Sequence, residues 1–83
     1  MIDDTIRSIL ADHGKLADDV GALPDSSDLY QAGLTSHASI SVMLALEDAF
    51  DIEFPEAMLQ KRTFESVAAI REAVRKLVGK DDP

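Results

Sequence analysis

The sequence predicts an all-α protein, a small four-helix bundle of three main helices and one short helix with a long first loop. Apolar residues recur at helical spacing in three separate segments, and no segment carries a convincing strand pattern. Hydrophobic residues make up 46% of the 83 residues, which is a globular composition, and cysteine is absent. A chain of this length supports one core. We therefore expect a single domain over residues 1–83, ordered from about residue 2 to residue 78.

The first helix is expected from Asp3 to about His13. Asp3 or Asp4 is available as its N-cap and Gly14 as its stop. The residues at helical spacing are Ile2, Ile6, Ile9, Leu10 and His13. This is the pattern of an amphipathic helix, and we interpret His13 as a boundary residue rather than as a ligand or a base.

A long loop follows, from about Lys15 to Thr35. It contains glycines, a proline and a polar cluster at residues 24–28, with isolated apolar residues that pin it to the core. A short turn is expected at residues 28–30, capped by Ser26 or Ser27. Loops of this length are uncommon in compact domains and are usually functional. Its position directly before Ser36 points to a site there.

The second helix is expected from about Ser36 to Phe50, with an apolar stripe that is largely buried. The stripe consists of Ile40, Met43, Leu44, Leu46, Ala49 and Phe50. Glu47 and Asp48 are expected on the exposed side of the helix.

Two further helices complete the predicted bundle. Pro55 favours the first turn of a short third helix over residues 56–60, in which Met58 and Leu59 cover the end of the core. Thr63 is the expected N-cap of a last helix from Phe64 to about Val78. Gly79 is expected to end that helix, followed by a frayed tail over residues 80–83.

Charge is distributed unevenly along the chain. The net charge is −8, yet Lys and Arg are absent between Leu16 and Gln60. That block holds nine acids: Asp18, Asp19, Asp25, Asp28, Glu47, Asp48, Asp51, Glu53 and Glu56. Binding to nucleic acid or to an anionic membrane requires basic residues, so the block argues against both partners. We expect basic protein surfaces as partners, and the alternative is that the acids serve solubility.

Two negative features narrow the class of protein further. No stretch is long enough to span a membrane, and the N-terminus is acidic where a signal peptide would be basic, so we expect a cytoplasmic protein. No paired acid and base, metal-ligand spacing or phosphate loop is present, so we expect neither an enzyme nor a metal site.

Ser36 is the candidate functional residue. A hydroxyl in the first turn of a helix is a favourable place to attach a phosphate, because unpaired backbone N–H groups and the positive end of the helix dipole face it. The alternative is that Ser36 is only an N-cap. Ser39 and Ser41 lie inside the helix and are poorer candidates. His37 is adjacent to Ser36, but neighbouring helical side chains diverge by about 100°, which argues against a catalytic pair.

These residues together resemble a known family, the acyl carrier proteins. The resemblance rests on Gly33 to Ser36 after a long loop, on the apolar helix, and on the stretch from Leu46 to Pro55, with Glu47 eleven residues after Ser36. It covers nearly the whole chain. Members of this family bear a covalent 4′-phosphopantetheine arm. The resemblance implies that a phosphopantetheinyl transferase attaches the arm to Ser36 from coenzyme A, and that the arm carries an acyl group as a thioester.

The resemblance also implies how partners are recognised. A shuttle of this kind is expected to be a monomer that moves its acyl group between a loading ligase and downstream acyl-using enzymes. The expected docking residues are Thr35, His37, Glu47, Asp48, Asp51, Glu53 and Glu56. The usual Asp-Ser-Leu of the family is Thr35-Ser36-His37 here. That departure raises the possibility of altered transferase recognition, or of an unmodified homologue.

Three functions remain open from the sequence. One is a specialised acyl carrier. The second is an aminoacyl carrier protein, loaded by a ligase that resembles the catalytic core of a seryl-tRNA synthetase. The third, of another class, is an acidic helical interaction module without a prosthetic group, in which Ser36 only caps the helix.

Overall fold

A computed structural model describes residues 2–14, 16 and 20–80 of the chain. Within them, three α-helices carry the fold: α1 (Ile2–His13), α2 (Ser36–Phe50) and α3 (Val67–Lys80). Three short 3₁₀ helices lie between them: η1 (Val20–Ala22), η2 (Glu56–Met58) and η3 (Lys61–Phe64). The described residues form no strand. The all-α bundle is confirmed, and so are the predicted ranges of the first two helices.

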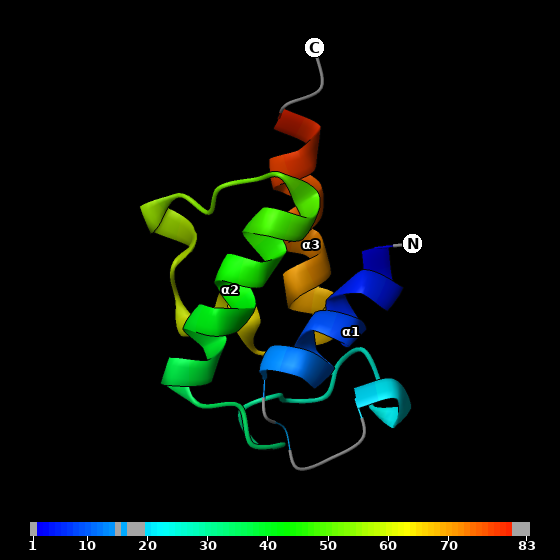
Figure 1. The fold of residues 1–83 in the computed structure, drawn as a ribbon. Coiled ribbons are helices and arrows are strands. Elements are labelled where there is room, and N and C mark those ends of the chain that lie inside the picture. Colours follow the sequence, from blue (N-terminus) through cyan, green and yellow to red (C-terminus); the bar gives the residue numbers. More distant parts are fainter. Residues whose placement is uncertain (1, 15, 17–19, 81–83) are drawn as a thin grey trace.

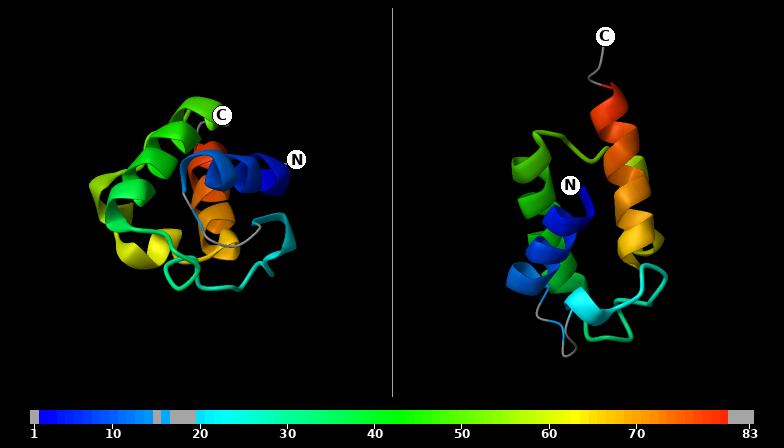
Figure 2. Two further views of the ribbon diagram at one scale, coloured as in Figure 1. Left: turned by 60° about the horizontal axis from the view of Figure 1, so that its bottom comes forward. Right: turned by 90° about the vertical axis from the view of Figure 1, so that its right-hand side faces the viewer.

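The helices are arranged so that one end of the bundle is closed by the long connection between α1 and α2 (Figure 1). Helix α1 runs toward that end, and α2 and α3 both run away from it. Figure 2 shows the segment after α2 returning along the outside of the bundle before α3 begins. Ser36, as the first residue of α2, therefore lies at the end that the long loop closes. None of the described helices is long and apolar enough to cross a membrane.

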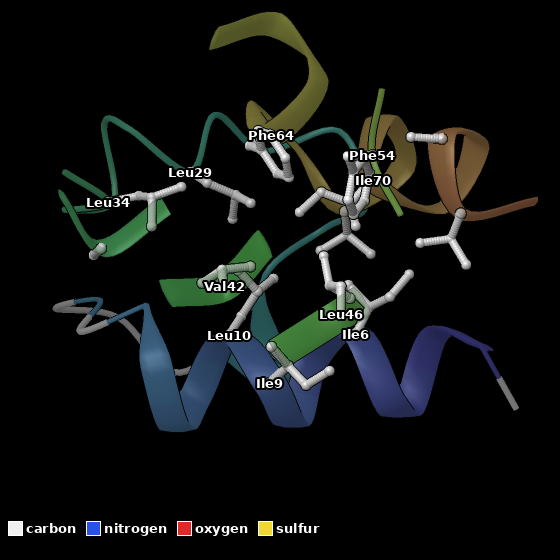
Figure 3. Close-up of a cluster of buried hydrophobic side chains, with 14 of the residues drawn as sticks. Ile6, Ile9, Leu10, Leu29, Leu34, Val42, Leu46, Phe54, Phe64 and Ile70 are labelled. Atoms are coloured by element: carbon white, nitrogen blue, oxygen red, sulfur yellow. The ribbon is translucent and has the colours of Figure 1, made fainter. Parts of the chain in front are cut away.

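The core is apolar throughout the described residues, which include no buried polar or charged side chain. Side chains from α1, α2, α3 and the loops point toward one another in it (Figure 3). The largest fully buried side chains are Ile6, Leu10, Leu29, Val42, Leu46, Val67, Ile70 and Val74. The rings of Phe54 and Phe64 meet with their centroids 5.5 Å apart. The polar groups available for function therefore lie on the surface.

The buried face of α2 differs from the predicted stripe. Its buried residues are Ala38, Val42 and Leu46, whereas Ile40 and Leu44 are each 55% exposed. Residues four apart line one face of a helix, so these three form one ridge directed into the core. The helix is apolar around most of its circumference, and the hydrophobic pattern therefore does not reveal which face is buried.

The segment between α2 and α3 also differs from its prediction. The expected short helix over residues 56–60 is the single 3₁₀ turn η2, and a second turn, η3 (Lys61–Phe64), includes the predicted cap Thr63 and the predicted first residue of the last helix, Phe64. Buried Phe64 holds η3 against the core, so α3 begins only at Val67. Its capping group is Ser66, whose Oγ accepts a hydrogen bond from the N–H of Ala69 at 3.0 Å, and not Thr63.

The end of α3 also differs from its prediction. Gly79 lies inside α3 and does not end it. A Cβ at this position would meet nothing within 4 Å. A glycine in an exposed last turn costs a helix little, since no packing depends on it. Of the expected frayed tail, Lys80 belongs to α3, and residues 81–83 lie outside the described residues.

The long loop is held to the core at several points, as its apolar residues predicted. Leu29 is fully buried, and its N–H donates to the carbonyl of Glu65 at 2.7 Å. The carboxylate of Asp28 accepts from the N–H of Tyr30 at 2.9 Å, so Asp28 is the turn cap instead of Ser26 or Ser27. The sequence did not predict η1.

An ionic cluster joins α1, the long loop and α3. Asp25 is at its centre: Arg7 Nη2 lies 2.6 Å from one carboxylate oxygen and Arg71 Nη1 lies 2.9 Å from the other. Arg71 also contacts Asp3 at 2.9 Å, and Arg7 donates to the carbonyl of Val20 at 2.6 Å. The hydrogen bonds from Arg71 and Arg7 hold the pKa of Asp25 below its ordinary value of 3.8.

We expect Asp25→Asn to lower the free energy of unfolding at pH 7, and the deficit relative to wild type to shrink in acid. A carboxyl group with a lowered pKa in the folded state stabilises the fold above its unfolded pKa, and this stabilisation is lost as the pH falls through the folded value. Urea unfolding at pH 7 and near pH 3 measures the difference. Asp12→Asn is the control, because Asp12 is exposed on α1 without an ion pair to any described residue. An equal deficit at both pH values would contradict the prediction.

Candidate functional site at the start of α2

The hydroxyl of Ser36 has no hydrogen-bond partner in the part of the chain that the structure describes, because its neighbour Thr35 caps the helix. Thr35 has an extended backbone, and its Oγ1 accepts a hydrogen bond from the N–H of Ala38 at 3.0 Å. Ser36 is therefore the first helical residue, and its side chain is exposed. None of the described residues hydrogen-bonds to its hydroxyl. The alternative that Ser36 acts as the N-cap is wrong.

The backbone before Ser36 is turned by Gly33 and anchored by Leu34. Gly33 has a φ of 119°, a value that residues with a side chain rarely adopt, and its N–H donates to the carbonyl of Tyr30 at 3.2 Å. Leu34 is buried, with its N–H 2.9 Å from the carbonyl of Leu29. Because Leu34 points into the core, Thr35 and Ser36 lie at the surface. This accounts for the glycine and leucine that precede the serine.

The start of α2 offers donors to a phosphate. Among the described residues, no acceptor is paired with the backbone N–H of Ser36 or of His37. Such orphan N–H groups, at the positive end of the helix dipole, favour an anion. An exposed hydroxyl beside unpaired donors fits the phosphate ester of a 4′-phosphopantetheine arm. Ser36 would hold the arm, and the arm supplies a thiol, which this cysteine-free chain lacks.

A hollow of about 480 Å³ adjoins Ser36. Its lining residues are Tyr30, Ser36, Ser39, Ile40, Met43, Leu59, Gln60, Lys61 and Phe64. Leu59 was expected to cover the end of the core, but it is 49% exposed at this hollow. A larger hollow of about 770 Å³ lies between α1 and α2 and does not include Ser36. The smaller hollow is therefore the one that belongs to the site.

The predicted docking residues fall into two groups on the surface. Thr35 and His37 flank Ser36, and both are exposed. The acids lie at the opposite end of α2 or beyond it, roughly 16 Å from Ser36 along the helix axis at 1.5 Å per residue. Asp48, Asp51, Glu53 and Glu56 are exposed, whereas Glu47 is only half-exposed. The structure therefore does not bring the acids together with the serine.

Glu47 has a structural role that the sequence did not reveal. Its carboxylate accepts a hydrogen bond from the N–H of Phe54 at 2.9 Å, and its carbonyl accepts one from the N–H of Ile52 at 3.0 Å. Asp51 adopts a left-handed conformation at the end of α2, with φ 53° and ψ 53°. Ile52 and Phe54 are buried. The stretch from Leu46 to Pro55 thus ends the helix and turns the chain back over the core.

Comparisons with known proteins agree with this geometry. The family described as "phosphopantetheine attachment site" matches residues 4–74. An aminoacyl carrier protein of Agrobacterium fabrum is 49% identical over 71 residues, 86% of each chain. The chain therefore belongs to the phosphopantetheine attachment site family. It is a carrier protein with a covalently attached 4′-phosphopantetheine. Carrier proteins work with the enzymes that modify them and are generally non-catalytic.

Solved structures show the same fold. One is the crystal structure of an engineered Bradyrhizobium japonicum glycine:[carrier protein] ligase complexed with a carrier protein from Agrobacterium tumefaciens and ATP. The match has a TM-score of 0.89 and 45% sequence identity, and it covers 93% of this chain and 100% of the matched chain. Another is a solution structure of a protein from Agrobacterium tumefaciens, with a TM-score of 0.74 and 45% identity over 98% of this chain and 99% of the matched chain.

We expect Thr35→Ala to lower the free energy of unfolding by about 1 kcal/mol, because it removes the N-cap of α2. Ser36→Ala is the matched change one residue later, and it removes a hydroxyl that forms no hydrogen bond with the described residues. We expect it to leave stability within about 0.5 kcal/mol of wild type, as for most surface changes. Urea unfolding of the apo proteins measures both. The reverse order of the two effects would show that Ser36 is the cap after all.

We expect Glu47→Ala to cost about 1 kcal/mol of stability, since it leaves the N–H of Phe54 without its acceptor. Asp48→Ala removes the same charge at the next position without breaking a side-chain hydrogen bond or ion pair to any described residue, and its effect on stability is expected to be nearly neutral. Thermal or urea unfolding of the two variants separates the structural role of Glu47 from a docking role. Equal stability of the two variants would refute the structural role of Glu47.

Proposed function

We propose that Ser36 carries the phosphopantetheine arm and that the loaded group is an amino acid. The observation that carries the attachment site is the exposed hydroxyl of Ser36, which makes no hydrogen bond to any described residue and belongs to the first residue of a helix that Thr35 caps. In the transferase reaction, the phosphopantetheine of coenzyme A would replace the hydroxyl proton of Ser36 and release adenosine 3′,5′-bisphosphate. Neither Ser39 nor Ser41 is comparable. The hydroxyl of Ser39 donates to the carbonyl of Ser36 at 2.7 Å, and Ser41 lies farther along the helix.

The aminoacyl cargo is supported by the relatives. The Agrobacterium fabrum protein is an aminoacyl carrier protein, and the matched crystal structure contains a glycine:[carrier protein] ligase. A packed core also suits a small cargo, since eight large side chains at its centre are completely buried. We infer that an amino acid:[carrier protein] ligase loads this chain, and that a transferase and downstream enzymes are its other partners.

A specialised acyl carrier is the second candidate. The hollow beside Ser36 is lined in part by Ile40, Met43, Leu59 and Phe64, which would accommodate a short apolar chain. This feature favours an acyl cargo, whereas the relatives favour an amino acid. The two candidates share the arm and the serine and differ only in the ligase that loads them.

We propose that the two groups of docking residues, those beside Ser36 and the acids at the other end of α2, contact different parts of a partner enzyme. Thr35 and His37 flank the attachment point and would contact the transferase and any active site that the arm enters. Asp48, Asp51, Glu53 and Glu56 would meet basic patches farther from that active site, where exposed charge pairs speed association and allow easy release. Glu47 contributes charge to this group while it holds Phe54. We propose that the protein acts as a single monomeric domain and performs no catalysis of its own.

The test is the intact mass after incubation with coenzyme A and a broad-specificity phosphopantetheinyl transferase. We expect one added phosphopantetheine on the wild type and on Ser39→Ala, and none on Ser36→Ala. The holo protein is then given ATP, an amino acid:[carrier protein] ligase and glycine, and separately a fatty acid ligase with a short acid. Mass gain with the amino acid supports the aminoacyl carrier, and gain only with the acid supports the acyl carrier. No phosphopantetheine on the wild type would overturn the attachment proposal.

A further inference from the structure

The larger hollow, between α1 and α2, is a groove that runs along both helices and does not include Ser36. Its volume is about 770 Å³, and its lining residues lie between Asp4 and His13 of α1 and between Ser41 and Ala49 of α2. Nine positions of α1 span roughly 14 Å at 1.5 Å per residue. Because Ser41 follows Ser36 by five residues, their side chains point about 140° apart around α2. A partner in this α1–α2 groove would therefore leave Ser36 accessible.

The middle of the α1–α2 groove is apolar. Leu44 of α2 is 55% exposed there, and the almost fully buried Ile9 of α1 lines the same groove. Ala45 and Ala49 also line it, and their small side chains leave room for a partner to approach. A large aliphatic side chain that stays exposed beside a concave apolar surface is typical of a surface that another molecule covers.

Both helices contribute an acid to one end of the groove. Asp4 belongs to the start of α1 and Asp48 to the end of α2, and the two helices run in opposite directions (Figure 1). No described residue forms an ion pair with either acid, whereas the neighbouring Asp3 is paired with Arg71 at 2.9 Å. The described lining residues include no Lys or Arg. The negative charge at this end of the groove is therefore left for a partner to neutralise.

We propose that the α1–α2 groove is a docking site for a basic amphipathic helix of a partner protein. Two to three turns of such a helix match the length of the groove. Its apolar face packs on Leu44 and Ile9, and a Lys or Arg near one of its ends pairs with Asp4 and Asp48. A protein bound here holds the carrier while Ser36 stays free for a second enzyme. The inference does not depend on what Ser36 carries.

The probe is a synthetic helical peptide of about 14 residues, a length at which an alanine-rich helix begins to form in water. It has leucines three and four residues apart on one face and arginines in the turn at one end. The peptide is titrated into ¹⁵N-labelled protein and followed by NMR. We expect the shifted backbone signals to come from the residues that line the groove. A peptide with glutamates in place of the arginines is expected to bind roughly ten-fold more weakly, and high salt to reduce this difference.

Two pairs of variants provide matched controls on α2. Leu44→Ala is expected to weaken binding of the arginine peptide roughly five-fold, whereas Ile40→Ala, at an equally exposed position outside the groove, is expected to keep the wild-type affinity. Asp48→Asn is expected to weaken binding roughly two- to five-fold, the size of an exposed ion pair. Asp51→Asn removes an exposed charge that does not line the groove, and is expected to leave binding unchanged.

Four outcomes would overturn the docking site. They are no binding of the arginine peptide, equal affinity of the wild type and all four variants, shifted signals centred outside the groove, and shifts of the groove signals with protein concentration alone, which would assign the groove to a second copy of the chain. The titration is repeated on Ser36→Ala. Unchanged binding is expected there, so the result stands whether or not the attachment at Ser36 does. Loss of binding would place the peptide on the Ser36 side of α2 and contradict the proposal.

Discussion

The burial of one face of α2 is the constraint on which the rest of the structure depends. Ala38, Val42 and Leu46 lie against α1 and α3, and this fixes the rotation of the helix about its axis. Because a helix turns by about 100° per residue, the same rotation leaves Ser36 and Ile40 on the outer surface. The exposure of Ser36, the proposed attachment point, and of the aliphatic side chains in the adjoining hollow therefore depends on which face of α2 the core buries.

The long loop fixes the position of the start of α2. Burial of Leu29 and Leu34, the left-handed turn at Gly33 and the ionic cluster around Asp25 hold it from several sides. Holding the loop in this way costs conformational entropy, which the buried leucines and hydrogen bonds offset. The hydroxyl of Ser36 is therefore exposed on an anchored backbone and takes no part in the hydrogen bonds that cap α2. A carrier needs this property, since its flexibility belongs in the arm.

The two ends of α2 have separate roles. One end bears the serine at a phosphate-favouring helix terminus, and the other bears Glu47 and Asp48, with three more acids in the segment that follows. The proposed attachment site and the proposed acidic docking group therefore lie at opposite ends of the helix. Glu47 shows that the division is incomplete, because its carboxylate both adds negative charge and fixes the return of the chain at Phe54.

Local signals in the sequence determined the helical class and the ranges of α1 and α2, and they singled out Ser36 as the candidate site. Periodic apolar residues, Gly14, and adjacent hydroxyls before an apolar run act within a few residues, so they can be read without the fold. Tertiary structure alone decided which hydroxyl caps α2, which face of that apolar helix is buried, and that Phe64 joins the core and delays α3. It also brought Tyr30 and Lys61 together across 31 positions. Such outcomes depend on packing between distant segments, which a pattern along one chain does not encode.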